Sequence, residues 1–222
     1  MAIRGVLLDV DGTLIDSNDA HARSWVETLA EFGYELPFER LRELIGMGGD
    51  HLLPEATGLE KDSSQGKAIS ERRKQLFKER YLSQIQPFAQ VRPLLAHMRG
   101  AGMRLVVATS ASPDELEALL ERSGAQDLIE ASTSSGDAKR SKPDPDIVGA
   151  ALERLDLPKE TVLMLGDTPY DVEAARRAGI GIVALRCGGW GDDDLGGALA
   201  IYDDPADLLA HFGESPFANS GG

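Results

Sequence analysis

The sequence predicts an α/β fold in which a parallel β-sheet carries helices on both faces. Short apolar runs alternate along the chain with amphipathic segments, and this alternation is typical of strand–helix–strand units. A second observation concerns residues 17–86, which contain helical patterns but no convincing strand. We therefore expect a small helical domain inserted after the first strand of the sheet.

The predicted strands and helices follow from local patterns. Four apolar runs, each followed by turn residues, predict buried strands at 3–8, 105–108, 162–165 and 180–185. Three segments with a proline near their start, where a missing N–H costs nothing, predict helices at 113–123, 145–155 and 169–178. Gly124 and Gly179 follow two of these helices, as helix-ending glycines do.

The helical insertion sets the predicted domain boundaries. Trp25, Leu29 and Phe32 form one apolar stripe, and a charged helix is expected over 67–82. We predict that residues 1–16 and 87–222 form the sheet domain and that 17–86 form the helical one. The two connections are expected near 16–18 and 86–90. The last ten residues, GESPFANSGG, predict a frayed tail.

Composition limits the possible partners. The 222 residues include 37 acidic and 23 basic side chains, which gives a formal net charge of −14. That balance argues against binding to nucleic acid or to an anionic membrane. The single cysteine, Cys187, cannot form an internal disulfide, and no apolar run approaches the ~20 residues of a membrane span. Together with the lack of a leader pattern, this predicts a soluble, cytoplasmic protein.

Polar residues follow the predicted strands and point to chemistry at one edge of the sheet. Asp9 and Asp11 follow the first strand, Thr109 and Ser110 follow the second, and Asp167 follows the third; Asp171 lies four residues later and Lys142 lies in a proline-framed loop. In a parallel sheet, ligands gather where the strands end. Clustered carboxylates without histidine or cysteine predict a Mg²⁺ site. A hydroxyl and a lysine beside such an ion predict a site for a phosphoryl group.

Each of these residues also has an ordinary structural explanation when taken alone. An aspartate at a strand end is often a turn or helix cap, and Asp171 is suited to the first turn of a helix. Lys142 alone would be a solvated surface residue. The coincidence of such residues at several strand ends favours the functional interpretation, although for Asp171 by itself the structural explanation stays open.

Four motifs carry a resemblance to a known superfamily. DVDGTL, TSAS, SKPDPD and GDTPYD, in this order, resemble the motifs of the haloacid dehalogenase-like hydrolases, and the similarity spans residues 6–209. The resemblance implies a Rossmann-like core with a helical cap inserted after the first strand. It favours the phosphatase branch, which includes phosphoglycolate phosphatases and proteins similar to beta-phosphoglucomutase.

The resemblance also implies catalytic roles. Asp9 corresponds to the nucleophile that becomes an aspartyl-phosphate, and Asp11 corresponds to the general acid/base. Ser110 corresponds to the hydroxyl that holds a phosphoryl oxygen, and Lys142 to the lysine that steadies nucleophile and phosphate. Thr109 ends the same strand and is a possible substrate contact; Ser110 is preferred because the downstream SASP aligns better.

The resemblance also implies metal ligands, and these lie in the DVDGTL and GDTPYD motifs. Asp9 and Asp167 are expected to bind Mg²⁺ through their carboxylates, and Asp11 through its backbone carbonyl. Asp171 is expected to support the metal, and whether it binds the ion directly is left open.

The second aspartate narrows the reaction. Dehalogenases and phosphonoacetaldehyde hydrolases of this superfamily lack an aspartate at the position of Asp11. A carboxyl group there suits expulsion of an alcohol from a phosphate ester, because Asp11 would protonate the leaving oxygen and then deprotonate water. We therefore expect a small phosphorylated metabolite as substrate, with phosphomonoester hydrolysis or phosphoryl transfer to a sugar as the reaction.

The predicted cap offers three further candidates for substrate contact. His21, within DSNDAHARSW, has the spacing found in the first cap helix of beta-phosphoglucomutase, although a packed structural histidine explains it equally well. Gly48 and Gly49, within IGMGGD, fall where related caps carry a specificity loop, and glycine allows the backbone to approach a ligand closely. The same loop follows a helix and lacks the last glycine of a dinucleotide fingerprint, so no nucleotide cofactor is indicated.

The sequence favours a phosphatase over a sugar phosphomutase. A mutase holds a second phosphate through its cap, and no basic residue lies between Arg42 and Lys61, where that contact is expected. Asp50 would repel a second phosphate there, although His51 and Arg23 are possible sources of positive charge. The mutase stays an alternative, and a non-enzymatic phosphoacceptor domain is a remote one. The sequence leaves the oligomeric state open.

Overall fold

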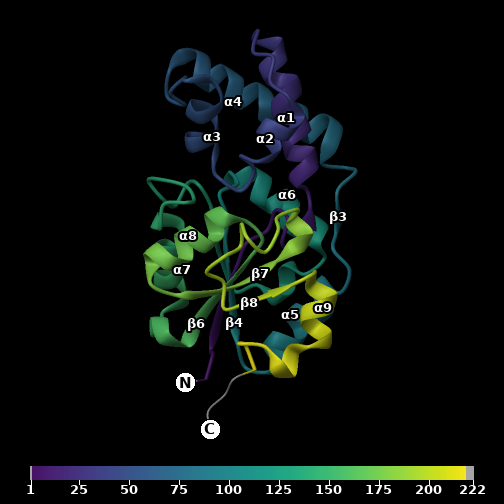
Figure 1. The fold of residues 1–222 in the computed structure, drawn as a ribbon, viewed down its shortest axis with the longest axis vertical. Coiled ribbons are helices and arrows are strands. Elements are labelled where there is room, and N and C mark those ends of the chain that lie inside the picture. Colours follow the sequence, from purple (N-terminus) through teal and green to yellow (C-terminus); the bar gives the residue numbers. More distant parts are fainter. Residues whose placement is uncertain (1, 219–222) are drawn as a thin grey trace.

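The computed structural model describes residues 2–218 and has a six-stranded parallel sheet at its centre (Figure 1). Its strand order is β5-β4-β1-β6-β7-β8. The strands are β1 (Gly5–Leu8), β4 (Arg104–Ala108), β5 (Ala131–Thr133), β6 (Val162–Gly166), β7 (Gly181–Leu185) and β8 (Ala200–Tyr202). The α/β fold with a parallel sheet is therefore confirmed.

Strand β1 lies in the middle of the sheet because it pairs with β4 on one side and β6 on the other. Gly5 is in register with Arg104 and with Val162. Every residue of β1 is buried, in keeping with the apolar run that predicted it. The carboxyl ends of β4, β1 and β6 consequently lie side by side at one edge of the sheet.

Helices cover both faces of the sheet, as the alternating pattern predicts. On one face, Val6 and Leu8 of β1 share an apolar core with α5 (Val91–Gly100), α6 (Pro113–Ser123) and α9 (Pro205–Ala210). On the other face, Leu7 packs into a second core with α7 (Asp146–Leu155) and α8 (Pro169–Ala178). Side chains alternate between the two cores because successive residues of a strand point to opposite faces.

The long segment after β1 is helical and has an apolar core of its own. It contains α1 (Asn18–Glu31), α2 (Phe38–Arg42), α3 (Gly49–Thr57) and α4 (Ser64–Leu76), which continues as a π-helical turn at Phe77–Tyr81. Trp25 and Leu29 are buried in this core, and Phe32 packs against it. Figure 1 shows these helices grouped at one end of the molecule.

The two connections to the helical segment run next to each other. Strand β2 (Ile15–Asp16) pairs with β3 (Gln86–Pro87) in a short antiparallel ribbon, with Asp16 opposite Gln86. This ribbon lies where the sequence predicts the connections. The helix expected over 67–82 begins earlier, at Ser64, because the Ser63 hydroxyl accepts a hydrogen bond from the Gly66 amide and caps the helix.

One sequence expectation about the core domain is wrong. The last ten residues were expected to fray, but within the described part Phe212–Glu214 forms a 3₁₀ turn, and Ser215 and Phe217 are completely buried. Phe217 stacks near Phe212 and belongs to the same core as β1. The rest of the expected tail, residues 219–222, lies outside the described residues.

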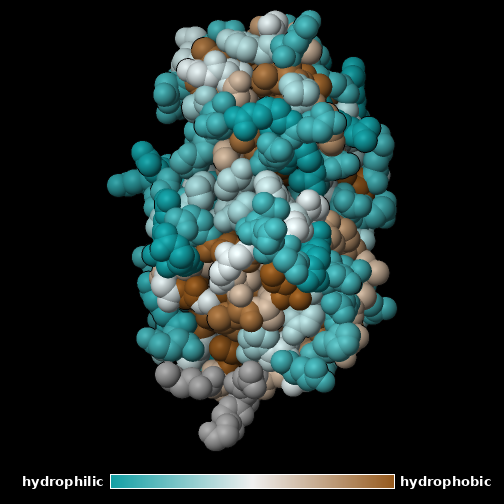
Figure 2. All heavy atoms as spheres, viewed as in Figure 1, coloured by the Kyte–Doolittle hydropathy of each residue, from teal (hydrophilic) through white to brown (hydrophobic). Residues whose placement is uncertain are grey.

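The surface is largely hydrophilic on the face drawn in Figure 2, with apolar atoms gathered mainly over the sheet half. Leu199 is the one large hydrophobic side chain that is exposed among residues 2–218. No helix in the described part of the chain combines the length and apolar character needed to cross a membrane.

Candidate active site

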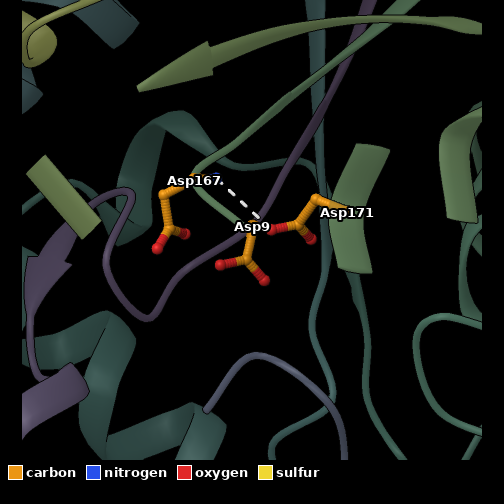
Figure 3. Close-up of side chains that lie close together, drawn as sticks. All are labelled: Asp9, Asp167 and Asp171. Carbon is orange, nitrogen blue, oxygen red and sulfur yellow. Dashed lines mark hydrogen bonds between the residues drawn. The ribbon is translucent and has the colours of Figure 1, made fainter. Parts of the chain in front are cut away.

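Three aspartates meet where β1 and β6 end. Asp9 follows β1 directly, Asp167 follows β6, and Asp171 lies in the first turn of α8 (Figure 3). One carboxylate oxygen from each lies within 4.8 Å of the others, and all three side chains are buried. The sequence predicts these three aspartates at the metal site. It also predicts Asp11 there, whose carboxylate does not belong to this cluster.

Asp171 is held by the start of α8. Its Oδ2 accepts hydrogen bonds from the Thr168 hydroxyl at 2.7 Å and from the Thr168 and Asp167 amides. The Asp171 amide in turn donates to the Thr168 hydroxyl, which completes a capping box. One oxygen of Asp171 is therefore committed to the backbone of the turn that carries Asp167. This arrangement suits a supporting role, because Asp171 fixes the position of Asp167.

Lys142 joins two of the aspartates. Its ammonium group, 1% exposed, donates to Asp9 Oδ1 and, at 2.7 Å, to Asp171 Oδ1. Burial alone would lower the pKa of this lysine, but the charges of Asp171 and Asp9 outweigh burial and raise it. Lys142 is therefore charged at neutral pH, and the interpretation of it as a solvated surface residue is wrong.

Asp167 lies in a tightly enclosed place. It accepts hydrogen bonds from the Thr13 hydroxyl at 2.7 Å and from the Asn18 amide group at 3.0 Å. A Cβ added to Gly12 would lie 2.1 Å from its Oδ2, and one added to Gly188 would lie 1.8 Å from it. Gly12 also has a φ of 79°, a conformation that favours glycine. The sequence analysis assigned no role to Asn18, whose Oδ1 is buried without a partner among the described residues.

The charges of this cluster do not balance. Burial raises the pKa of Asp9 to about 7, against the opposing charge of Lys142 and with additional repulsion from Asp171 and Asp11. Burial and repulsion from Asp9 also raise the pKa of Asp167 well above its usual value. One lysine cannot offset three buried carboxylates. Closely spaced oxygen donors with excess negative charge are what a small hard cation such as Mg²⁺ requires, so the donor set fits that ion.

The Asp11 carboxylate is not part of the cluster formed by the other three aspartates. Its Oδ1 accepts a hydrogen bond from the Ser17 hydroxyl at 2.6 Å and lies 2.7 Å from His21 Nε2. Burial would raise the pKa of Asp11, but the electrostatic interaction and hydrogen bond with His21, together with the hydrogen bond from Ser17, lower it below its usual value. The structure thus separates Asp11, which faces the helical segment, from Asp9, which faces Lys142.

His21 is oriented by a residue that the sequence analysis did not single out. Arg73 of α4 contacts His21 Nδ1 through Nη2, and a guanidinium has donors only. His21 Nδ1 must therefore accept, so Nε2 carries the proton that is donated to Asp11. Arg73 also forms an ion pair with Glu115 of α6, and the His21 ring stacks on Phe77 at 4.2 Å between centroids. His21 is thus packed and also oriented toward the site.

The hydroxyl groups after β4 take different positions. Ser110 Oγ accepts a hydrogen bond from the Lys142 amide at 3.4 Å, which brings it next to the lysine loop. Thr109 is buried, and its hydroxyl accepts from the Ala111 amide at 3.1 Å. Both residues line the same cavity as Asp9 and Asp11.

A cavity of about 150 Å³ lies between the carboxyl edge of the sheet and the helical segment. His21, Gly48 and Gly49, which the sequence predicts as substrate contacts, all line it. A Cβ at Gly48 would lie 2.2 Å from Ser141, so the glycine lets this loop approach the residue before Lys142.

Basic residues line the helical side of this cavity, but they come from outside the interval between Arg42 and Lys61. Lys61, Arg73 and Lys74 all line it. Asp50, which was expected to repel a second phosphate, does not line the cavity; its Oδ2 accepts a hydrogen bond from the Ser141 amide at 3.0 Å. These basic side chains come from α4 and the connection before it, beyond the loop to which the sequence argument was confined.

Comparisons with known proteins match the chain to a family of enzymes. A family model described as haloacid dehalogenase-like hydrolase matches residues 6–185. A phosphoglycolate phosphatase from Rhodospirillum rubrum is 30% identical over 215 residues, which cover 92% of this chain and 89% of that protein.

Two solved structures are similar over most of their length. A hydrolase from Pseudomonas syringae superposes with a TM-score of 0.88 at 31% identity, covering 95% of this chain and 98% of that one. CbbY from Rhodobacter sphaeroides, solved in complex with phosphate, gives a TM-score of 0.80 at 28% identity and covers 93% and 96% of the two chains.

Proposed function

Because the chain belongs to the haloacid dehalogenase-like hydrolases and is a phosphatase, a hydrolase of phosphoric monoesters, we propose that it cleaves a small organic phosphomonoester through a phosphorylated Asp9. Mg²⁺ is the proposed cofactor. The proposed catalytic residues are Asp9, Asp11, Ser110 and Lys142. We further propose that residues 17–86 act as a cap on a core formed by 1–16 and 87–222.

The observation that carries this proposal is the position of Lys142. Its buried ammonium group donates hydrogen bonds to Oδ1 of Asp9 and to Oδ1 of Asp171. Lys142 therefore holds one carboxylate oxygen of Asp9 in place. Within residues 2–218, the second oxygen, Oδ2, has only a long hydrogen bond of 3.4 Å from the Thr13 hydroxyl. Asp9 therefore has one oxygen held in place and one available to attack phosphorus.

The first half of the reaction forms a bond to Asp9. Its free carboxylate oxygen attacks the phosphorus atom, and the bond between phosphorus and the ester oxygen breaks. Asp11 acts here in its protonated form, which its lowered pKa makes the minor form at neutral pH, and donates its proton to the departing alkoxide, which leaves as an alcohol. Ser110 and Lys142 are proposed to hold phosphoryl oxygens, and the hydrogen bond from the Lys142 amide to the Ser110 hydroxyl supports this proposal.

The second half returns the enzyme to its starting state. Asp11, now a carboxylate, takes a proton from water, and the resulting hydroxide attacks phosphorus. The bond between phosphorus and Asp9 breaks, which releases inorganic phosphate and frees the Asp9 carboxylate. The hydrogen bonds from Ser17 and His21 stabilise the carboxylate form of Asp11 needed here.

Asp9 and Asp167 would hold Mg²⁺, together with the backbone carbonyl of Asp11 that the family resemblance implies. When bound, the ion would supply positive charge to offset the phosphoryl oxygens and Asp9. Asp171 would fix the position of Asp167 by accepting a hydrogen bond from its amide through Oδ2. It would also hold Lys142 by accepting a hydrogen bond from its ammonium group through Oδ1. Thr13 and Asn18 orient the Asp167 carboxylate.

The compact cavity supports a small metabolite as substrate. Phosphoglycolate, on which the Rhodospirillum rubrum relative acts by name, is the first compound to test. The decisive experiment incubates the purified protein and Mg²⁺ with a panel of phosphorylated metabolites and measures released phosphate. An acid-quenched reaction with ³²P-labelled substrate should leave label on the protein, sensitive to hydroxylamine, and Asp9→Asn should carry none.

The sugar phosphomutase alternative is tested in the same experiment. Beta-glucose 1-phosphate is supplied with a catalytic amount of the 1,6-bisphosphate, and formation of glucose 6-phosphate is compared with phosphate release. Faster isomerisation than hydrolysis would overturn the phosphatase assignment. Phosphate release without any protein-bound label would instead reject the covalent route.

A further inference from the structure

The wall of the cavity opposite the aspartates carries basic side chains from one part of the helical segment. Lys61 lies in the connection before α4, and Ser70, Arg73 and Lys74 lie on α4 itself. Residues three and four apart on a helix share a face, so Ser70, Arg73 and Lys74 point to the same side. We call this set the α4 wall.

The positive charge of Arg73 is offset by an ion pair, whereas the charges of Lys61 and Lys74 are not. The Arg73 guanidinium pairs with Glu115 and also contacts His21 and Ser24. Among the ion pairs formed within residues 2–218, Lys61 and Lys74 take part in none. The acidic residues that line the cavity are Asp9 and Asp11 on the sheet side and the paired Glu115. The α4 wall therefore carries two uncompensated positive charges in a protein whose net charge is −14.

A hydroxyl group on the same wall also lacks a partner. Ser70 Oγ is buried and makes no hydrogen bond with any described residue. A buried hydroxyl without a partner is costly, and such groups in native proteins are often satisfied by a bound ligand or water. Ser70 and Lys74 are separated by one helical turn, so a single anionic group can contact both.

We propose that Lys61, Ser70 and Lys74 form a distal anion site, so that the substrate is a small phosphomonoester with a second anionic group at the end remote from the scissile phosphate. This inference rests on the proposed phosphatase function. The second group is a carboxylate or a further phosphoryl group, since both offer the oxygen acceptors that ammonium and hydroxyl donors bind. Trp25 and Leu52 line the cavity as well and suit a short carbon skeleton between the two anions.

The test compares pairs of substrates with and without a distal anionic group. One pair is phosphoglycolate and its primary amide, and the other is propane-1,3-diol bisphosphate and propane-1,3-diol monophosphate. The first pair tests a carboxylate and the second a phosphoryl group, at two lengths. We expect kcat/KM for the anionic member of at least one pair to exceed that of its neutral partner by roughly 10- to 100-fold, the effect of one or two charge-assisted hydrogen bonds.

Three variants locate the source of that preference. Lys74→Ala and Lys61→Ala should each reduce the preference about tenfold or more, mainly through KM of the anionic substrate, and Lys74→Arg should restore most of it. Lys67→Ala is the matched control, because Lys67 is an exposed lysine of the same helix that does not line the cavity. It should leave the preference unchanged. Added salt should weaken the preference, since the lysines are near solvent.

The outcomes separate this inference from the proposed function. Phosphate release without a preference for the anionic member of either pair would overturn the distal anion site and leave the phosphatase standing. A preference that survives in both Lys61→Ala and Lys74→Ala would also overturn it. No phosphate release from any compound in the presence of Mg²⁺ would reject the phosphatase itself.

Discussion

The two sides of the cavity are built in different ways. The sheet side, which carries Asp9, Lys142 and Asp167, consists of residues next to strand ends whose positions are fixed by buried hydrogen bonds. The helical side, which carries Gly48 and the α4 wall, draws on separate segments of residues 17–86 and includes the exposed Lys74. A rigid edge suits chemistry that demands fixed distances, whereas a wall assembled from loops and helix faces can change without disturbing it.

The difference indicates a division of labour. Residues of the sheet side form one connected network, so a change in any of them should alter the chemical step for every substrate. Residues of the helical side reach that network through a few hydrogen bonds: Ser17 and His21 bind Asp11, Asn18 binds Asp167, and Asp50 binds the Ser141 amide. Changes there should depend on the substrate or act through those contacts. The following predictions test this division, beginning with the largest expected effect.

Asp9→Asn should abolish turnover. An amide is a poor nucleophile and lacks the negative charge that pairs with Lys142, so no phosphorylated enzyme can form. Phosphate release from any active substrate is the measurement, with circular dichroism to verify folding. Retention of more than a few per cent of the activity would contradict the covalent mechanism.

Removal of divalent cations should also abolish activity, because Asp9, Asp167 and Asp171 are buried together with a single lysine. Treatment with EDTA should stop phosphate release, Mg²⁺ should restore it, and Ca²⁺ should restore little, since its longer and more variable coordination misplaces the ligands. Added Mg²⁺ should also raise the Tm of the metal-free protein. Full activity in protein shown to be metal-free would contradict this prediction.

Asp11→Asn should slow the chemical step by about 10²–10⁴-fold, the typical contribution of a general acid or base. The variant should still gain thermal stability from Mg²⁺, because the Asp11 carboxylate lies outside the three-aspartate cluster. The informative comparison uses a substrate with a good leaving group, such as 4-nitrophenyl phosphate, for which the defect in forming the phosphoenzyme should shrink. An equal loss with all leaving groups would argue against proton donation by Asp11.

Asp50→Ala should reduce kcat by roughly tenfold, the effect expected when one hydrogen bond to a charged acceptor is lost. Asp50 accepts from the amide of Ser141, next to Lys142, so its loss should loosen the loop that presents the lysine. Asp50→Asn keeps an acceptor oxygen and should retain most of the activity. A change in KM alone, with kcat unaltered, would mean that Asp50 acts on substrate binding and not on the lysine loop.

Glu115→Gln should have the smallest effect on chemistry and act mainly on stability. Burial would raise the pKa of Glu115, but the charge of Arg73 outweighs it, with help from His21 and Ser112, and the pKa is lowered below 4.5. The stabilisation is therefore fully present above that value and lost as pH falls through the folded-state pKa. At pH 7 the variant should be destabilised by about 1–3 kcal/mol.

The pH dependence provides the check on Glu115. As the pH falls, the wild-type carboxyl also becomes neutral, so the difference in the free energy of unfolding between wild type and Glu115→Gln should shrink. Urea denaturation at pH 7 and at successively lower pH values measures this difference. If this difference in the free energy of unfolding stays constant down to about pH 3, the charge of Glu115 contributes nothing to stability.

The sequence predicts the sheet side of the site far better than the helical side, and the reason is local. Asp9 and Asp167 directly follow buried apolar runs, so the strand that positions each residue is visible in the residues beside it. Lys74 and Arg73 lie on a charged helix whose pattern gives no sign of which face meets the cavity. His21 shows the intermediate case, because its helix is predictable but its contact with Arg73, 52 positions away, is not.

The fold itself follows the same rule. The four central strands and three of the helices have strong apolar or proline signals and lie where the sequence predicts them. The two edge strands escape prediction because β5 (AST) and β8 (AIY) are only three residues long and partly exposed. Helices α5 and α9 also escape it; α9 is six residues long and is stabilised by the Asp204 side chain, which caps two amides.

The strand order separates β1 in time from its partner strands during synthesis of the chain. It is the first strand of the described residues to be made, yet it lies at the centre of the finished sheet. Its neighbour β6 begins at Val162, 157 residues after Gly5, an interval of roughly 8–30 s at 5–20 residues per second on the ribosome. Throughout that time Val6, Leu7 and Leu8, which are completely buried in the finished protein, lack one or both partner strands. The nascent chain must therefore shield an apolar strand while the helical segment, whose core is contained within 22–69, can already fold.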